Sequence, residues 1–530
     1  MSSLGTLDRI IEFGSDAEKM NRIALISDSQ RWTYYDLKNH VDLFSGFLLN
    51  NGLQKGDRVM VFLPNCPKFV ITYLGTINAG GVMAALNPRH SQKELLYVAK
   101  DIHPKFFITL RDFAELNREI IKVLPPDCKV MIVDLASDLP VKLRLLYRLK
   151  NLFKRPRSGH FRWRDIVNLK NLGVRTYRDG CGNIYPVQNR PEDLAVLQFT
   201  GGTTGNPKTA MLTHDNLASN ADQALAVVSE ALNKDSVMYG GLPCFHIFAL
   251  ACLNMALMRG ATFVLDLRPS PDTILKLIPK HRINLLPGIP KLFAGMLKSP
   301  KFAKTDFSSL KLCVSGAGAL DVSVKQEFER AAECEIIEGY GLSETSPVVC
   351  INPIGRGRPG TLGIPVQDTE IRIEEDGELW VRGPQVMLGY WRNNEESGKA
   401  FAPGGWFKTG DMVRQDGEYL ILTDRKKDMV KVSGENIFPS EIEGIIRTHP
   451  DVGEVAVVGV PDRDTGERIV ACIVLKAGSG GITEAELMAF FVQAFGNQRL
   501  KRPKQILILK ELPKNFLGKV LKKELRKMIS

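Results

Sequence analysis

The sequence lacks both an apolar run long enough to cross a membrane and the features of a signal peptide. The longest apolar stretch, residues 247–258, is shorter than the roughly 20 residues that a membrane-spanning helix needs. The first residues, Met-Ser-Ser-Leu-Gly-Thr-Leu-Asp, contain neither a basic start nor an apolar core. We therefore expect a cytoplasmic protein.

Paired cysteines are also missing. The nine cysteines are scattered, their number is odd, and no two of them form a C-x-x-C motif. This pattern argues against a disulfide framework or a zinc site and favours a reducing compartment. The net charge is +11, but no recognised nucleic-acid-binding motif accompanies it, so nucleic acid is a poor candidate partner.

The remaining composition is that of an ordinary globular protein, with 44% hydrophobic and 24% charged residues. At 530 residues the chain is too long for one hydrophobic core, which predicts two or more domains. Apolar runs at 58–63, 106–109 and 130–133 are typical of buried strands, and 67–79 and 92–100 are typical of helices. Strands that alternate with helices predict an α/β architecture of parallel sheets covered by helices.

A loop rich in Gly and Thr follows the apolar run at 194–198. It reads Phe-Thr-Gly-Gly-Thr-Thr-Gly-Asn-Pro-Lys over residues 199–208 and offers backbone N–H groups, hydroxyls and one cation. A polyphosphate needs such donors, but the spacing of Lys208 does not fit the Walker pattern. The loop therefore predicts nucleotide binding by something other than a P-loop NTPase. Its candidate ligands are Thr200, Gly201, Gly202, Thr203, Thr204, Gly205 and Lys208.

Four further motifs follow the loop in order. They are Gly-Tyr-Gly-Leu-Ser-Glu-Thr at 339–345, Trp-Phe-Lys-Thr-Gly-Asp at 406–411, Asp-Arg-Lys-Lys-Asp at 424–428 and Lys-Asn-Phe-Leu-Gly-Lys at 514–519. Together the five motifs resemble those of adenylate-forming enzymes, the superfamily of acyl-CoA synthetases, luciferases and peptide-synthetase adenylation domains. The similarity covers nearly the whole chain. Residues 198–205 and 383–391 look most like bacterial long-chain fatty acyl-CoA ligases.

The resemblance implies the adenylate-forming enzyme fold. A large N-terminal domain of helix-covered sheets, residues 1–426, would hold the ATP and acyl sites. A small mobile C-terminal α+β domain, residues 427–530, would carry the adenylation lysine Lys519, with Lys427 as the hinge. The implied ligands are a fatty acid, ATP, Mg²⁺ and coenzyme A, and a homodimer is a further candidate assembly.

The implied reaction has two halves. A carboxylate attacks the α-phosphorus of ATP and gives acyl-AMP and pyrophosphate, and a thiol then attacks the acyl carbonyl and expels AMP. By resemblance Glu344 would anchor Mg²⁺, and Lys519 would bridge the acyl carboxylate and the α-phosphate. Thr200 and His246 are the other catalytic candidates.

The resemblance also assigns contacts around the nucleotide and the thiol. Ser343 would donate to the α-phosphate, Tyr340 would stack near the adenine, and Asp411 would accept the ribose hydroxyls. Further candidates for ATP are Gly316, Ala317, Gly318, Gly339, Gly341 and Arg425. Candidates for coenzyme A are Lys431, Ser433 and Gly434.

His246 lies in a segment, 242–248, that resembles the border of the acyl pocket. It would gate the carboxylate end of that pocket, contact the path of the thiol, or pack in the core. Residues 247–258 and 285–291 would line a hydrophobic slot. Each methylene contributes roughly 0.8 kcal/mol in such a slot, so neighbouring chain lengths are weakly discriminated. We expect a medium- to long-chain acid.

Two features depart from the resemblance. Thr209 stands where the family usually has Gly after the loop lysine, and a positive φ there would strain a β-branched residue, so we expect a shifted loop. Between residues 142 and 164 there are nine Lys or Arg and no acid, with leucines at helical spacing. Residues 141–164 are either a helix on the inner face of an anionic membrane or a surface loop.

A fatty acyl-CoA ligase is the leading hypothesis. The alternatives are an acyl-AMP ligase that loads a carrier protein, an aryl-CoA ligase, and a catalytically silent lipid- or nucleotide-binding protein. The presence of Lys208, Glu344, Asp411, Arg425 and Lys519 argues against the silent protein.

Overall fold

The computed structural model describes residues 5–10, 17–28, 30–87, 91–110, 113–133, 161–162, 187–200, 207–476, 478, 482–514 and 520–529. The chain divides into two compact units. The first unit comprises Met1–Glu370 and Arg382–Phe401, and the second comprises Ile371–Val381 and Ala402–Ser530. The boundary predicted at 426/427 is the hinge of a moving domain. A division into compact units does not test where a domain moves, so this boundary stays a prediction.

The first unit contains a nine-stranded sheet in which the middle strands run parallel. Its order is β16 (Ile364–Pro365), β15 (Val348–Ile351), β14 (Glu335–Gly341), β13 (Leu312–Ser315), β12 (Leu285–Gly288), β10 (Val237–Gly240), β11 (Thr262–Leu265), β1 (Ile23–Ser27) and β2 (Gln30–Thr33). The helices between these strands include α10 (Pro271–His281), α11 (Pro290–Leu297) and α12 (Val322–Ala332). This alternation confirms the predicted parallel α/β architecture.

The same unit contains a seven-stranded sheet. Its order is β7 (Phe161–Arg162), β6 (Lys129–Val133), β5 (Phe106–Leu110), β3 (Arg58–Phe62), β4 (Val82–Ala85), β8 (Leu194–Thr200) and β9 (Lys208–Thr213). Strands β3, β5 and β6 confirm the runs predicted at 58–63, 106–109 and 130–133. Only β9 is antiparallel to its neighbour, because it returns along β8 directly after the Gly/Thr-rich loop.

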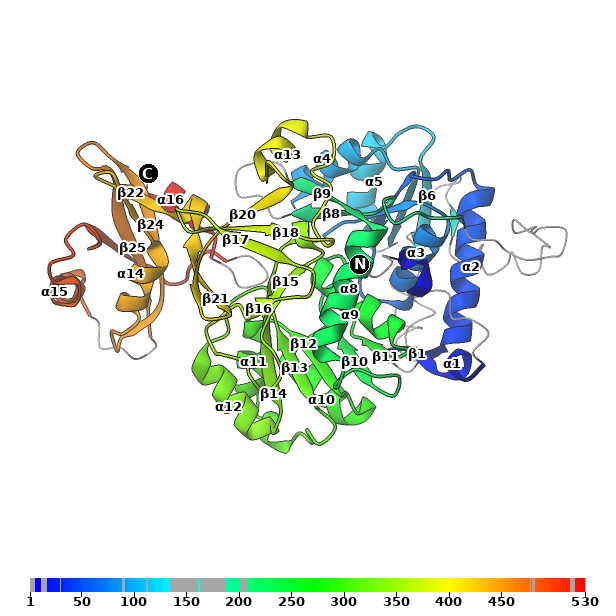
Figure 1. Ribbon diagram of the computed structural model, residues 1–530, viewed down its shortest axis with the longest axis horizontal. Helices are drawn as coiled ribbons and strands as arrows, with labels where there is room; N and C mark the ends of the chain where they lie inside the picture. Colours follow the sequence, from blue (N-terminus) through cyan, green and yellow to red (C-terminus); the bar gives the residue numbers. More distant parts are fainter. Residues whose placement is uncertain are drawn as a thin grey trace. The chain divides into compact units, whose positions relative to one another are not determined.

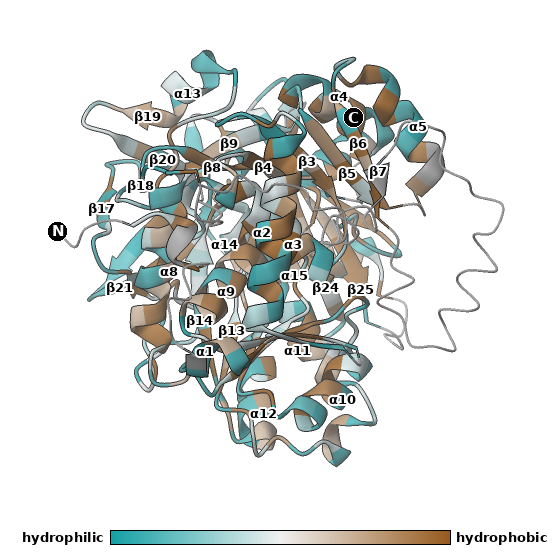
Figure 2. Ribbon diagram, turned by 90° about the vertical axis from the view of Figure 1, so that its right-hand side faces the viewer, coloured by the Kyte–Doolittle hydropathy of each residue, from teal (hydrophilic) through white to brown (hydrophobic). Residues whose placement is uncertain are grey.

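Helices cover both faces of the seven-stranded sheet, which explains why its strands are apolar throughout. Met60 and Phe62 of β3 share a core with α4 (Gln92–Ile102), and α3 (Pro67–Asn78) packs on β3 and β4. Every residue of α3 is buried, since α2 (Tyr34–Asn50) packs on it as well. Figure 2 shows β3, β5 and β6 in brown, whereas the outer helix α12 carries teal residues.

Two helices connect the sheets of the first unit. Helix α9 (Ile247–Met258) packs on β10 and β11, and α8 (His214–Val228) packs on α9, β9 and β15 (Figure 1). Helix α8 begins with a capping box in which Thr213 and Asn216 bond each other's backbone. The first helical turn after β9 is therefore fixed in place.

The second unit contains two smaller sheets. One is formed by β17 (Glu370–Ile373), β18 (Glu378–Arg382), β20 (Trp406–Asp416), β19 (Phe401–Ala402) and β21 (Tyr419–Arg425). The other is formed by β23 (Glu435–Ile437), β22 (Val430–Val432), β25 (Gly466–Leu475), β24 (Val452–Asp462) and β26 (Gln505–Ile508). Helices α14 (Pro439–Ile446) and α15 (Glu484–Phe495) share the core of the second sheet, and α16 (Lys522–Ile529) packs on β24.

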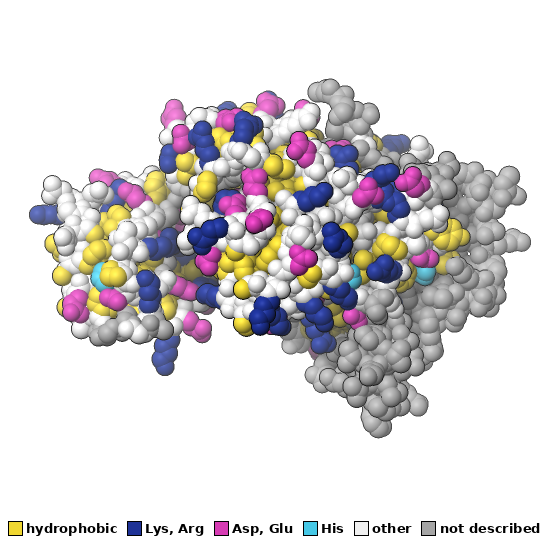
Figure 3. All heavy atoms as spheres, turned by 90° about the horizontal axis from the view of Figure 1, so that it is seen from below, with side chains coloured by type: hydrophobic (Ala, Val, Ile, Leu, Met, Phe, Trp, Pro, Cys, Tyr) yellow, Lys and Arg dark blue, Asp and Glu magenta, His cyan; other side chains and the backbone are white. Residues whose placement is uncertain are grey.

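Acidic and basic side chains are interspersed over the described surface in the view of Figure 3. The densest run of cations in the sequence lies at 142–164. The structure describes only 161–162 of that run, as β7. The predicted membrane-surface helix therefore lies outside the described residues.

Candidate active site

Four parallel strands of the nine-stranded sheet end at one edge. Strands β10, β12, β13 and β14 are consecutive neighbours, so the segments that leave their carboxyl ends emerge side by side. These segments contain His246, Pro290, Gly316–Gly318 and Ser343–Glu344. In open α/β sheets, ligands bind outside the carboxyl ends of the strands. The fold therefore brings the predicted acyl and adenine segments to the edge where a ligand is expected.

The glycines after β13 allow these segments to touch. A Cβ on Gly316 would lie 3.0 Å from Cε1 of Phe248, and one on Gly318 would lie 3.8 Å from Cγ of Pro290. Ala317, between them, has a φ of 68°. The predicted adenine segment is thus in contact with both segments that were expected to line the acyl slot.

His246 occupies the position just before α9. Its backbone N–H donates to the carbonyl of Pro243 at 2.9 Å, and its ring centroid lies 4.6 Å from that of Phe245. Gln198 of β8, two residues before Thr200, donates from Nε2 to the carbonyl of Phe245 at 3.1 Å. The segment that carries His246 is therefore tied to the strand that leads into the Gly/Thr-rich loop.

Asn65 holds the same segment and was missed in the sequence. Its Nδ2 donates to the carbonyls of Gly240 at 3.1 Å and Leu242 at 2.7 Å, and its Oδ1 accepts from the backbone of Cys244 at 2.8 Å. The side chain is buried, so each of these bonds replaces one that water would make. The available signal was a polar residue two positions after the buried strand at 58–63.

The motif at 339–345 forms the end of β14 and a short 3₁₀ turn, η5 (Ser343–Thr345). A Cβ on Gly341 would lie 1.9 Å from the carbonyl oxygen of Pro347, which also accepts a hydrogen bond from the backbone of Leu342 at 3.0 Å. Only glycine fits this approach. The turn η5 packs on β8 and β9, which places Ser343 and Glu344 beside the two strands that flank the Gly/Thr-rich loop.

Glu344 is held by the segment 387–391. The hydroxyl of Tyr390 donates to Oε1 of Glu344 at 2.9 Å, and the backbone of Met387 donates to the carbonyl of Glu344 at 2.9 Å. Burial, followed by the charge of Glu344, raises the pKa of Tyr390 well above its usual range, so the phenol stays a donor. Tyr390 is not among the predicted site residues, although it lies in segment 383–391, which resembles bacterial long-chain fatty acyl-CoA ligases.

Lys208 begins β9, opposite Thr200 of β8. Its ammonium forms an ion pair with Glu396 of α13 (Asn394–Ala400) and lies 4.9 Å from the centroid of the Tyr390 ring. The hydrogen bond from Lys208, and then the one from Lys399, lowers the pKa of Glu396 to about 2. Tyr390 therefore contacts both the predicted magnesium anchor and the predicted phosphate ligand.

Thr209 lies in β9 with strand backbone, paired with Phe199. Its carbonyl accepts from the backbone of Trp391 at 2.8 Å, and Met211 exchanges backbone hydrogen bonds with Leu388 and Gly389 at 3.0 and 2.9 Å. The concern about a positive φ at Thr209 was therefore misplaced, because the residue is extended and β-branched residues favour strands.

Two predicted ribose residues meet in the second unit. Asp411 of β20 is the register partner of Arg425 of β21, and Nε of Arg425 lies 3.2 Å from Oδ1 of Asp411. Only 4% of the Asp411 side chain is exposed, whereas 36% of Arg425 is exposed. The paired carboxylate is thus oriented by its own hairpin.

The predicted hinge and thiol residues also belong to the second unit. Lys427 lies in a 3₁₀ turn, η6 (Lys426–Asp428), and the preceding Lys426 pairs with Asp376 at 2.7 Å and Glu378 at 2.8 Å. The candidates for coenzyme A follow in β22 and in the turn that joins β22 to β23. They are Lys431, which is exposed, and Ser433 and Gly434, with φ values of 51° and 87°.

Several predicted site residues lie outside the described residues. They are Gly201, Gly202, Thr203, Thr204 and Gly205 of the loop, and Lys519.

The residues around Glu344 fit a magnesium ion that is shared with a nucleotide. Among the described residues, no group of three His, Cys, Asp or Glu side chains could hold a metal ion. Mg²⁺ usually takes one or two protein carboxylates, and phosphate oxygens and water supply the remaining ligands. A single carboxylate beside the two strands that flank the predicted phosphate loop is consistent with such a site.

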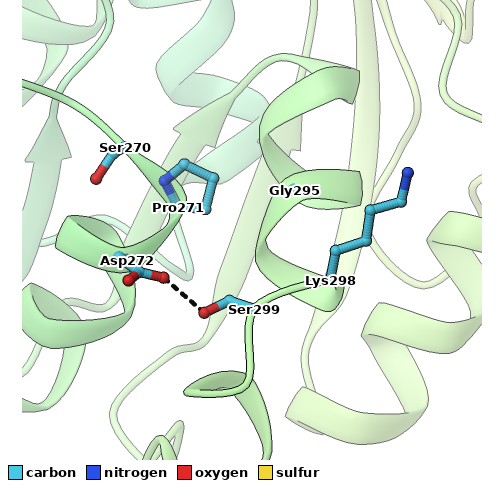
Figure 4. A pocket seen from close by; sticks show the side chains of 6 residues that line it. All are labelled: Ser270, Pro271, Asp272, Gly295, Lys298 and Ser299. Atoms are coloured by element: carbon cyan, nitrogen blue, oxygen red, sulfur yellow. Dashed lines mark hydrogen bonds between the residues drawn. The ribbon is translucent and has the colours of Figure 1, made fainter.

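A pocket of about 390 Å³ lies between the start of α10 and the end of α11 (Figure 4). None of the predicted site residues lines it. Two of its polar residues are bonded to each other, since the hydroxyl of Ser299 donates to Asp272 at 2.6 Å. We assign it no function.

Along the part of the chain that the structure describes, no helix combines the length and apolar character needed to cross a bilayer.

The sequence matches two protein-family models. Residues 14–391 match the model described as AMP-binding enzyme, and residues 441–519 match the AMP-binding enzyme C-terminal domain. The chain is 37% identical to the long-chain-fatty-acid–CoA ligase of Bacillus subtilis (strain 168), with 96% of this chain and 92% of that protein covered. It is 34% identical to the protein of the same name from Haemophilus influenzae, with 96% and 92% covered.

Among solved structures, the ATP-bound MatB from Rhodopseudomonas palustris superposes with a TM-score of 0.84 at 26% identity and covers 99% of both chains. The predicted fold, a large N-terminal α/β domain with a small C-terminal domain, is confirmed by this match and by the two family models.

Proposed function

The chain belongs to the AMP-binding enzyme family, and from this premise we propose that it is an ATP-dependent fatty acid–CoA ligase. It would activate a medium- to long-chain acid as acyl-AMP and transfer the acyl group to coenzyme A. One observation carries the proposal. Lys208 and Glu344, from motifs far apart in the sequence, meet around Tyr390 at the strand that follows the Gly/Thr-rich loop. The names of the two relatives support the fatty acid as substrate.

The first half of the reaction is limited by repulsion, because a carboxylate must approach a polyphosphate. Lys208 and the backbone of residues 201–205 would bind phosphate oxygens, and Ser343 would donate to the α-phosphate. Glu344 would hold Mg²⁺, which supplies further neutralisation when bound. Lys519 would bridge the two reactants in the transition state, where a cation raises the rate more than the affinity.

The proposed contacts of the nucleoside come from the segment 316–318 and from two of the motifs. Tyr340 and the segment 316–318 are the proposed adenine contacts, at the carboxyl edge of the nine-stranded sheet. Asp411 would accept the ribose hydroxyls with its two oxygens, and the ion pair with Arg425 would orient that carboxylate.

In the second half of the reaction, the thiol must reach the acyl carbonyl at the place that Lys519 would occupy in the first half. We propose that the domain after residue 426 rotates about Lys427, withdraws Lys519, and presents Lys431, Ser433 and Gly434 to the pantetheine. Motion that reassembles one site for two steps is an established device. His246 and the apolar residues of α9 would border the acyl chain, because α9 is buried along nearly its whole length.

A pyrophosphate-release assay tests this function. The purified chain is given ATP, Mg²⁺ and a panel of acids (acetate, octanoate, palmitate and 4-coumarate), with and without coenzyme A. We expect release with the fatty acids and acyl-CoA formation only when coenzyme A is present. Release without thioester would favour loading of a carrier protein, activity confined to 4-coumarate would favour an aryl-CoA ligase, and no release with any acid would favour a silent binding protein.

A further inference from the structure

The ammonium of Lys208 already has an anionic partner in the first unit. It forms an ion pair with the carboxylate of Glu396, and the side chains of Lys208 and Glu396 are 31% and 28% exposed. Glu396 lies on α13, directly after the segment 387–391 that is hydrogen-bonded to β9. The backbone contacts of that segment therefore fix the carboxylate opposite the lysine.

Glu396 has a second cation, which makes it independent of Lys208. Nζ of Lys399 lies 2.9 Å from Glu396 and 2.6 Å from Glu395 on the same helix. If Lys208 leaves, Glu396 keeps a counter-charge and no carboxylate is stranded. The pair is also partly exposed, so solvent screens it and its separation is inexpensive.

The ammonium of Lys208 would also keep one contact after its ion pair with Glu396 breaks. The Tyr390 ring supports the ammonium, and the bond from Tyr390 to Glu344 fixes that ring. A cation over an aromatic face is attracted wherever it sits above the ring. Lys208 can therefore turn from one anion to another while it stays over Tyr390.

We infer that Glu396 is an internal counter-anion that holds Lys208 until a phosphate group of the nucleotide displaces it. Glu396 is a positioning residue, because it acts through Lys208 and competes with the ligand. The inference rests on the proposed phosphate-binding role of Lys208. It adds a determinant of ATP affinity that lies outside the five motifs of the family.

The test measures ATP binding to the full chain by isothermal titration calorimetry without an acid substrate. Glu396→Gln removes the competing charge, and we expect ATP to bind about threefold more tightly, a modest change because a partly exposed pair is weak. Glu395→Gln is the matched control, since it removes an equal charge that pairs with Lys399 but not with Lys208. We expect it to leave the dissociation constant unchanged.

Lys208→Met supplies the second half of the test. It should weaken ATP binding, and adding Glu396→Gln to it should then have no effect. Weaker or unchanged ATP binding in Glu396→Gln, or equal tightening in Glu395→Gln, would overturn the inference.

If Lys208→Met leaves ATP binding unchanged, both the inference and the phosphate role of Lys208 are wrong. The pyrophosphate-release assay on the unmodified chain remains a separate readout of the proposed function. Melting temperatures of all variants identify any that fail to fold.

Discussion

Tyr390 links two charged residues that lie far apart in the sequence. Its hydroxyl donates to Glu344 and its ring supports Lys208, so Tyr390→Phe removes one interaction and keeps the other. A carboxylate without this donor is less well oriented, and we expect a Mg²⁺ concentration for half-maximal adenylation that is about tenfold higher, since a hydrogen bond to a charged group contributes about 1.5–3 kcal/mol. Pyrophosphate release is measured against Mg²⁺ at fixed ATP.

Tyr35→Phe is the control for this prediction, because Tyr35 is 57% exposed and distant from the motif in sequence. An unchanged Mg²⁺ dependence in Tyr390→Phe would mean that Glu344 does not need the phenol. A fall in the maximal rate alone, at unchanged Mg²⁺ dependence, would also contradict the assignment.

Asp411 offers a test on the ribose. Asp411→Asn keeps the shape of a buried side chain but removes the charge that pairs with Arg425. We expect the KM for ATP to rise about tenfold, because hydrogen bonds to charged groups are the stronger kind. The variant should also lose the preference of the parent for ATP over 2′-deoxy-ATP, which a purely structural role would leave intact.

Asp416→Asn, an exposed position on the same strand, is the matched control. Discrimination against 2′-deoxy-ATP that survives in Asp411→Asn would place the ribose contact elsewhere.

At the scale of elements, the approach of β14 to the carbonyl of Pro347 sets the position of η5. Gly341→Ala would place Cβ 1.9 Å from that oxygen, so the backbone must move. We expect the free energy of unfolding to fall by about 1–3 kcal/mol and adenylation to fall further, because Glu344 moves with the turn. Chemical denaturation and pyrophosphate release measure the two effects.

Gly398→Ala is the counterpart in α13, where a Cβ would meet nothing within 4 Å. Helix propensity predicts a gain of up to about 1 kcal/mol there. Equal stability of the two alanine variants would show that the turn tolerates displacement.

The elements themselves were largely predictable. The apolar runs at 58–63, 106–109 and 130–133 became β3, β5 and β6, because a strand buried on both faces must be apolar throughout. The helices at 67–79 and 92–100 became α3 and α4 within two residues at their ends. The local pattern of apolar residues was sufficient to predict these elements, because whether a segment is buried is visible in its own residues.

The contacts between elements were not predictable from local pattern. The bond from Tyr390 to Glu344 depends on the register of 387–391 along β9, and the bonds of Asn65 join the segment after β3 to the end of β10 in the other sheet. The strain predicted at Thr209 came from the Gly that the family usually has there. The structure shows no such strain, because Thr209 is paired with Phe199 in a strand. Such relations are set by tertiary packing.

At the scale of the whole molecule, the basic segment 141–164 remains a predicted membrane contact. If the segment is a helix, Lys142, Arg144 and Arg148 would flank its apolar stripe, and each such charge contributes about 1 kcal/mol near an anionic surface. Replacing all three by Gln should reduce sedimentation of the protein with phosphatidylserine vesicles and leave ATP binding unchanged. Equal sedimentation of the variant and the parent would instead favour the surface loop.

Lys519 is proposed to act in the first half of the reaction and not in the second. Lys519→Ala should abolish acyl-AMP formation, because no other residue is proposed to bridge the carboxylate and the α-phosphate in the transition state. Thioester formation from supplied acyl-AMP and coenzyme A should persist, since that step joins a thiol to an activated carbonyl without a new polyanion. Both steps are followed by liquid chromatography of the nucleotide and acyl products.

Lys514→Ala, five residues earlier and paired with Glu454, is the control. Equal loss of both steps in Lys519→Ala would show that one arrangement of the C-terminal domain serves the entire reaction, and the proposed rotation about Lys427 would then be unnecessary.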